Sequence, residues 1–202
     1  MARNTLAHTL HDVGLAAWFG GTLMGAIGVN GAAADVDDPR QRARVANAGW
    51  ARWTPFNAAA IGAHLVGGAM ITQQNKGRVA TQKGVAGWTI GKTALTSAAL
   101  AATAYSRVLG KKLQKAGDFP AAGGTEPTVG TPPEAAAAQK QLKALQWAIP
   151  GLTGGLLYSN AVMSEQQKTS EVVKGTAQRL TETVTSAAKH PGQLATAVRS
   201  AF

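Results

Sequence analysis

Hydrophobic and polar positions are strongly segregated along this chain of 202 residues. Four stretches, 13–34, 54–75, 84–106 and 144–164, together hold 88 residues but a single charged side chain, that of Lys92. The other 29 of the 30 charged residues lie between and outside them. Each stretch is 21 to 23 residues long, close to the length of about 20 residues that a helix needs to cross a bilayer. The pattern predicts four transmembrane helices.

Tryptophans mark the beginning of every stretch. Because an indole ring favours the boundary between lipid and water, these residues are predicted to anchor the helices at the membrane interface. The predicted anchors are Trp18, Trp50, Trp53, Trp88 and Trp147. Lys92 follows Trp88 by four residues on the same helix face, so its ammonium group is expected to extend back to the headgroup level.

Helix signals in the connecting segments refine these limits. Thr54-Pro55 offers an N-cap and a proline at the first helical position, so the second span should begin there. Asp38-Pro39 predicts a separate, short basic helix that runs to about Ala48 along the interface. Pro150-Gly151 is expected to kink the fourth span.

The predicted organisation has four parts. Residues 1–115 form a three-span membrane region, and 116–133, rich in proline and glycine, form a flexible, solvated linker. Residues 134–164 form a helix that leads into the fourth span, and 165–202 form a basic tail. Within the tail, apolar side chains recur every three or four residues from Val173 to Ala187, which predicts an amphipathic helix. Such a helix suits a membrane surface, a partner, self-association or a solvated position.

Glycine spacing indicates how the spans pack. In a bilayer, helices associate through small residues that allow their backbones to approach closely. Gly14, Ala17, Gly21, Gly25 and Gly28 share one face of the first span. The helix-packing glycines are predicted to be Gly14, Gly21, Gly25, Gly28, Gly67, Gly68, Gly87, Gly91, Gly151 and Gly155. The predicted fold class is therefore all-α, a polytopic membrane protein with four transmembrane helices in a bundle packed through small residues, followed by a C-terminal amphipathic helix. The glycine faces could alternatively dock other subunits.

His64 is the candidate binding residue, because it lies at the middle of the second stretch. An imidazole at the centre of a bilayer must be paired. It can form an interhelical hydrogen bond, bind a metal or a haem, or take part in proton transfer. His11 is the other candidate haem ligand. It lies about 12 residues from the centre of 13–34, roughly 18 Å at the helical rise. The two histidines are therefore expected at different depths and not on one haem. Isolated methionines and the absence of cysteine argue against copper.

Charge and composition narrow the function classes. The net charge of +10 comes from basic residues spread over every connecting segment without a nucleic-acid-binding motif, which favours anionic lipid headgroups over nucleic acid as partners. The two sides of the predicted topology carry nine and ten Lys and Arg residues, so the charge bias does not orient the protein. No arrangement of catalytic residues or phosphate-binding loop is recognisable, and no catalytic activity is expected.

The run Leu10-His11, Gly14 and Trp18-Phe19-Gly20-Gly21 resembles the opening helix of small bacterial four-helix membrane proteins related to the copper-resistance D group. The use of alanine, glycine and arginine resembles that of actinobacteria. The resemblance implies a four-helix bundle and, for some members, copper handling. It also implies a location in the bacterial cytoplasmic (plasma) membrane as a multi-pass protein.

The sequence therefore predicts a non-catalytic integral membrane protein that acts as an accessory or assembly subunit of a larger membrane complex or as a homo-oligomer. It needs no cofactor in this interpretation. The alternative is a haem- or copper-binding membrane module centred on His64. A small transporter or channel is a third possibility, disfavoured because the four stretches contain no carboxylate.

Overall fold

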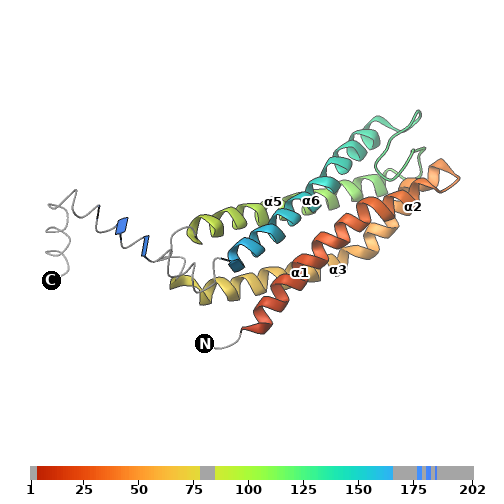
Figure 1. Cartoon of the computed structure of the whole chain (residues 1–202). Helices are drawn as coiled ribbons and strands as arrows, with labels where there is room; N and C mark the ends of the chain where they lie inside the picture. The colour runs from red at the N-terminus through yellow and green to blue at the C-terminus, as the bar shows by residue number, and fades with distance from the viewer. Residues whose placement is uncertain (1–3, 78–84, 166–176, 179–180, 183–184, 186–202) are drawn as a thin grey trace.

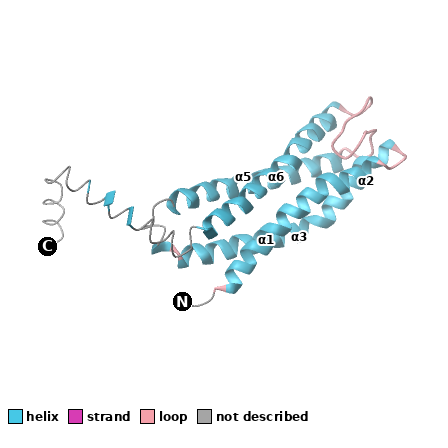
Figure 2. Cartoon of the chain, in the orientation of Figure 1, coloured by secondary structure: helices cyan, strands magenta, loops and turns pink. Residues whose placement is uncertain are grey.

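The computed structural model describes residues 4–77, 85–165, 177–178, 181–182 and 185. Four long helical segments run along an elongated bundle, and the described residues contain no strand (Figures 1 and 2). The prediction of an all-helical fold with four main helices is confirmed. The predicted amphipathic helix of the tail lies almost entirely outside the described residues.

The first helical segment is longer than the stretch 13–34 from which it was predicted. It comprises α1 (Thr5–Met24), a π-helical turn η1 (Gly25–Val29) and α2 (Asn30–Ala34) without a break. Among the described residues, this run Thr5–Ala34 is the one helix long and apolar enough to cross a membrane. It ends beside the turn that carries Asp35, at the end of the bundle opposite the N-terminus (Figure 1).

The second segment, α3 (Pro39–Gln74), is one continuous helix and not a short interfacial helix followed by a span. The Asp38 carboxylate accepts a hydrogen bond from the backbone N–H of Arg40 at 3.0 Å and caps the helix. Pro55 lies inside it, and just before it the Thr54 hydroxyl donates to the Trp50 carbonyl at 2.9 Å. The helix continues because its first turns are buried by contacts with residues 116–132.

The other two helices are α5 (Val85–Lys115) and α6 (Pro133–Glu165), which contains the buried Pro150. α1 runs antiparallel to α3, and α5 runs antiparallel to α6 (Figure 1). α1 also packs on α6, whereas α3 and α5 touch little. The middle of the bundle is filled by an apolar cluster of Leu15, Trp18, Ala99, Ile149 and Leu156.

Two glycines fix the register of α1 against α3. A Cβ atom on Gly14 would lie 2.5 Å from the Ala60 carbonyl oxygen, and one on Gly67 would lie 2.5 Å from the backbone nitrogen of His11. Real Cβ atoms are not found so close to a backbone, so only glycine permits this approach. Farther along the same pair, Gly21 faces the Trp53 ring and Gly25 faces the Trp50 ring.

The segment between α5 and α6 differs from the solvated linker expected. Phe119 and Ala121 are buried in an apolar cluster with Ala43, Leu109 and Leu142. We call residues 116–132 the cap, because they close the end of the bundle (Figure 2). Gly117 begins the cap with φ of 75°, a left-handed conformation that ends α5 and that glycine adopts without strain.

Hydrogen bonds join the cap to the beginning of α3. The Ala121 N–H donates to the Pro39 carbonyl at 3.1 Å, and the Arg42 guanidinium donates to the Ala122 carbonyl at 3.3 Å. Arg44 and Asp118 form an ion pair at 3.2 Å. The basic residues at the start of α3 therefore contact the cap, which explains why this helix is not a separate interfacial element.

Candidate functional site

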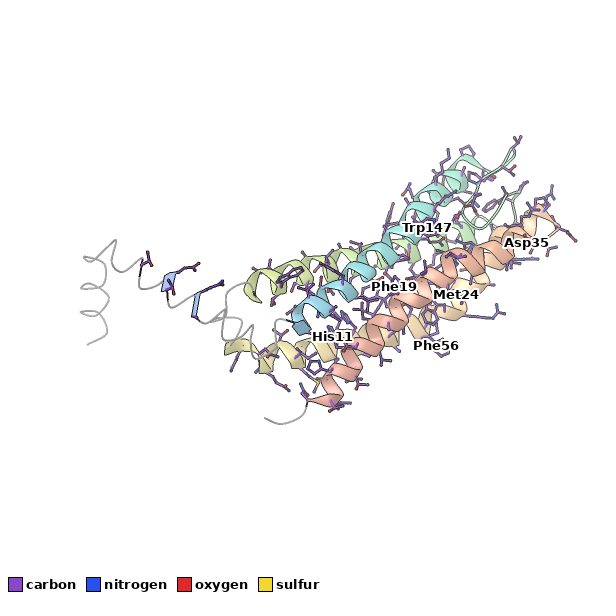
Figure 3. The ribbon with its side chains drawn as sticks, viewed as in Figure 1. His11, Phe19, Met24, Asp35, Phe56 and Trp147 are labelled. Carbon is purple, nitrogen blue, oxygen red and sulfur yellow. The ribbon has the colours of Figure 1, made fainter. Side chains whose placement is uncertain are left out.

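His11 of α1 and His64 of α3 lie together inside the bundle. Their ring centroids are 4.3 Å apart with the ring planes inclined by 37°, and each residue is only 3% exposed. The prediction that the two histidines lie at different depths is therefore wrong. Figure 3 shows His11 on α1 near the level at which α6 ends.

The error comes from the helix limits. His64 was placed at the centre of 54–75, but α3 begins at Pro39, and the helical run of α1 begins at Thr5. His11 lies about eight residues before the midpoint of Thr5–Ala34, and His64 about eight residues after the midpoint of Pro39–Gln74. In an antiparallel pair these positions coincide. Charge-free stretches alone do not define where two helices align.

The His11 ring joins an acidic and a basic side chain. Its Nδ1 atom lies 2.9 Å from Oδ1 of Asp12, and its Nε2 atom lies 2.8 Å from Nζ of Lys92 on α5. An ammonium group can only donate, so Nε2 accepts and the ring proton resides on Nδ1, which donates to Asp12. The result is a hydrogen-bonded chain of carboxylate, neutral imidazole and ammonium whose charges balance. Sequence analysis had expected Lys92 to extend to headgroup level instead.

His64 and Asn160 complete what we call the histidine cluster: His11, Asp12, His64, Lys92 and Asn160. Nδ1 of His64 lies 3.0 Å from the backbone carbonyl oxygen of His11, so this nitrogen carries the proton and donates. Nδ2 of Asn160 on α6 donates to the Asp12 carboxylate at 3.3 Å. All four main helices thus contribute to the cluster, and Trp18 packs edge-on against His64 with ring centroids 6.3 Å apart.

A cavity of about 290 Å³ lies beside the cluster between α3 and α5, where these helices touch little. His64 and Lys92 line it together with Thr72, Thr93 and Thr96. Each of these threonine hydroxyls donates to a backbone carbonyl of its own helix, so it offers only acceptor oxygen to the cavity. The cavity therefore combines one ammonium group with several acceptors, which suits water molecules bridging the cluster.

The cluster as folded does not fit a haem held by both histidines. Metal–nitrogen bonds of about 2 Å on either side of an iron would hold two axial rings farther apart than 4.3 Å. Both ring nitrogens of His11 are already hydrogen-bonded, one of them to an ammonium group. Within the described residues no group of three or more His, Cys, Asp or Glu side chains is arranged to hold a metal ion.

The five predicted anchor tryptophans have different surroundings. Trp18 is fully buried and donates from Nε1 to the Thr103 hydroxyl at 3.2 Å. Trp50 donates from Nε1 to Oδ1 of Asn30 at 3.0 Å, and Trp53 stacks with Phe56. Trp88 is partly exposed, and the Trp147 ring is exposed on α6 (Figure 3).

The predicted packing glycines differ in how closely they approach other helices. Gly14, Gly21, Gly25, Gly67 and Gly68 face other helices at distances that leave little or no room for a side chain. Gly155 has ordinary contact with Leu95, and Gly28 faces only Met24 of its own helical run. In contrast, no other atom lies within 4 Å of where a Cβ would stand on Gly87, Gly91 and Gly151. Gly87, Gly91 and Gly151 therefore do not contribute to packing within the described bundle.

Sequence reasoning missed Asp12 and Asn160 as members of the cluster. Asp12 directly precedes the stretch 13–34, outside the predicted span. A usable signal existed, because an acid next to His11 and a lysine on another helix are expected to meet when both lie in apolar surroundings. Comparison of the chain with family models, with curated proteins and with solved structures gives no match.

Proposed function

We propose that this chain is a multi-pass integral protein of the bacterial plasma membrane, without catalytic activity, that serves as an accessory or assembly subunit of a membrane complex. One observation carries the proposal: the bundle exposes large apolar side chains and buries polar ones. Phe56, Ile90 and Val13 are 68%, 70% and 62% exposed. Among the buried side chains are those of His64, Asn57 and Thr153. A membrane protein has this distribution, since its exterior faces lipid.

The register of the helices supports a particular position of the bilayer. Residues 52–74 of α3 lie opposite the residues from about 5 to 25 of the first helical segment. The contacts of Gly14 with His64 and of Gly21 with Trp53 indicate this register. We therefore place the first span near residues 5–25 and not 13–34. The cap and the charged start of α3 then lie outside the lipid. The histidine cluster lies within it, where a charge-balanced chain of Asp12, His11 and Lys92 is far less costly than an isolated charge.

A partner is suggested by the glycines that pack against nothing in the bundle. Gly87 and Gly91 lie on an exposed face of α5, with the spacing through which membrane helices approach each other. We propose that this face binds a helix of a partner subunit or of a second copy. The basic residues outside the lipid would bind anionic headgroups.

The membrane position is testable with single cysteines, because the natural chain contains none. In native membranes, a membrane-impermeant maleimide should label Val129→Cys, in the cap and 97% exposed, and leave Val66→Cys unlabelled. Val66 is 53% exposed on α3, so it should react once the membrane is dissolved in denaturant. Equal labelling of both variants in intact membranes, with release of the protein by alkaline carbonate, would contradict the proposal.

The subunit role needs a separate experiment. The tagged protein is purified from native membranes in mild detergent, and what co-purifies is identified by mass spectrometry and native mass measurement. Gly91→Leu should abolish the association without altering thermal unfolding of the chain. Gly62→Leu is the matched control, because Gly62 is an exposed glycine of α3 that also faces open space. A monomer without partners before any substitution would eliminate the subunit role and leave the membrane position standing.

A further inference from the structure

A second cavity, of about 90 Å³, lies between all four main helices on the cap side of the histidine cluster. Its polar lining includes Asn47, Asn57, Arg107 and Gln146, and Trp50 and Trp53 supply aromatic walls. A cavity of about 10–15 Å³ already holds one water molecule, and one of about 150 Å³ holds benzene. The space therefore suits a ligand somewhat smaller than benzene.

Two buried polar atoms of the lining have no hydrogen-bond partner within the described chain. They are Nε1 of Trp53, a donor, and Oδ1 of Asn57, an acceptor. Asn57 is only 8% exposed. Buried polar atoms are nearly always paired, because an unpaired one retains its full desolvation cost. The two atoms therefore call for a ligand that accepts one hydrogen bond and donates another.

The charge of the cavity specifies the ligand further. The Arg107 guanidinium lines it, forms no ion pair within the described residues, and has no carboxylate among the other lining side chains. Oε1 of Gln146 already accepts one hydrogen bond from Asn30, so that amide offers the cavity two N–H donors and at most one further acceptor position. The Thr22, Thr54 and Ser106 hydroxyls donate to carbonyls of their own helices and leave acceptor oxygens. The five N–H groups of Arg107, with those of Gln146 and Trp53, still outnumber the acceptors, as in sites for anions.

We propose that this cavity binds a small hydroxycarboxylate, a short organic acid that carries a hydroxyl group. The carboxylate accepts paired N–H bonds from Arg107, whose planar fork matches its two oxygens, and a further bond from the Trp53 indole. The hydroxyl group donates to Oδ1 of Asn57. Both unpaired atoms and the unpaired charge are then satisfied by one ligand of about five or six non-hydrogen atoms. The proposal does not depend on the subunit role.

The test uses the full chain in mild detergent, with thermal unfolding and titration calorimetry as readouts. Glycolate and lactate should raise the midpoint of unfolding in proportion to their binding, and acetate, which lacks the hydroxyl group, should bind more weakly. Arg107→Gln should weaken glycolate binding by about tenfold or more, since a charge-assisted pair is lost. Arg52→Gln is the matched control, because Arg52 is an exposed arginine of α3 that does not line the cavity.

Trp53→Phe provides a second variant that keeps the ring and removes only the donor. It should weaken glycolate binding several-fold and leave the fold intact, which circular dichroism verifies. Nuclear magnetic resonance of the indole N–H groups should show the Trp53 signal moving on addition of glycolate. The proposal is overturned if no organic acid binds and the cavity contains only water, if Arg107→Gln binds glycolate as well as the natural chain, or if inorganic phosphate binds equally well.

Discussion

At the scale of single residues, the chain of Asp12, His11 and Lys92 matters because it links two helices through an imidazole that carries no net charge. Lys92 donates to His11, and Asp12 supplies the balancing charge from the other side of the ring. Removing one charge leaves the other without its compensating partner across the buried His11 ring. The stabilising effects of Asp12 and Lys92 should therefore depend on each other.

A double-mutant cycle measures this dependence. Asp12→Asn and Lys92→Met are compared singly and together by chemical unfolding in detergent. We expect a coupling free energy of about 0.5–3 kcal/mol, with the double variant less destabilised than the sum of the single ones. Lys76→Met is a control, since Lys76 lies outside the cluster. Strict additivity of Asp12→Asn and Lys92→Met would contradict the hydrogen-bonded chain.

Gly67 sets the closest backbone approach beside the cluster. Gly67→Ala forces a methyl group against the backbone of His11 and should lower the free energy of unfolding by about 1–3 kcal/mol through overpacking. The exposed Gly91→Ala, whose added methyl group meets no other atom, should leave stability unchanged or raise it, because alanine favours helix. Thermal unfolding of the two variants in parallel distinguishes a steric effect from a general effect of replacing glycine. An equal change in thermal stability for Gly67→Ala and Gly91→Ala would refute the steric effect.

At the scale of elements, α3 depends on how its first turn is capped. The Asp38 carboxylate accepts hydrogen bonds from the backbone of Arg40 and from the Gln41 side chain, and these bonds lower the pKa of Asp38 below its usual value of 3.8. A lowered pKa in the folded state means that the stabilisation is complete above the unfolded value and is lost as the pH falls through the folded value.

Asp38→Asn preserves a capping oxygen but does not titrate. The midpoint of thermal unfolding of the natural chain should exceed that of Asp38→Asn near neutral pH. That difference should shrink as the pH falls below the usual pKa of 3.8 and through the lowered pKa of the folded state, as the carboxylate becomes protonated. The measurement is a series of melting curves over this range. A difference that stays constant with pH would show that the carboxylate charge contributes nothing.

The cap contributes its own part of the core. Phe119 is 3% exposed against Leu109, Leu113 and Ala43, so Phe119→Ala should lower the free energy of unfolding by about 3–5 kcal/mol. Val129→Ala, at an exposed position of the same segment, should change it by less than about 0.5 kcal/mol. Urea unfolding of both variants checks the difference. If Phe119→Ala were as mild as Val129→Ala, the cap would be a loose linker after all.

The elements also show what the sequence can predict. Segregated charge and the Asp38-Pro39 signal correctly indicate four helical regions and the start of α3. The continuation through Pro55 could not be predicted, because it depends on residues far away in the sequence: Ala43 packs in one cluster with Phe119, and Ala46 faces Gly124. The burial of Phe119 was hidden for the same reason: proline and glycine around it indicate turns, but they do not reveal whether a turn packs against a distant helix.

At the scale of the whole molecule, the proposed membrane position places the cap on one side, and the start of α1 and the end of α3 on the other. Val129→Cys in the cap and Lys76→Cys, at an exposed position just beyond α3, should therefore be labelled by impermeant maleimide from opposite faces of the membrane. Labelling of intact cells compared with inverted vesicles gives the orientation that nine against ten basic residues leaves undetermined. Labelling of both positions from one face would be incompatible with four spanning helices.

The alignment of helices is the property of the whole molecule that the sequence conceals most. His11, His64 and Lys92 are each recognisable in the sequence as polar residues in or beside an apolar stretch. No local pattern, however, indicates that they share one depth along the bundle. That depth follows from close backbone contacts at Gly14 and Gly67, which are a property of two surfaces together. The glycine spacing indicates a packing face, and the register between two such faces requires the structure.

The π-helical turn Gly25–Val29 has a consequence for which deletions this chain can tolerate during evolution. A π turn amounts to one extra residue within an α-helix, and beyond it Asn30 is oriented to bond both Gln146 and Trp50. Deleting a single residue from the turn would restore regular α-helix and leave everything after it facing nearly the same way, because the five residues of the π turn rotate the chain about as far as four α-helical residues do. Loss of one codon within the turn should therefore preserve the hydrogen bonds of Asn30 with Gln146 and Trp50, whereas loss of one codon from the regular part of α1 would rotate Asn30 away from both by about 100°.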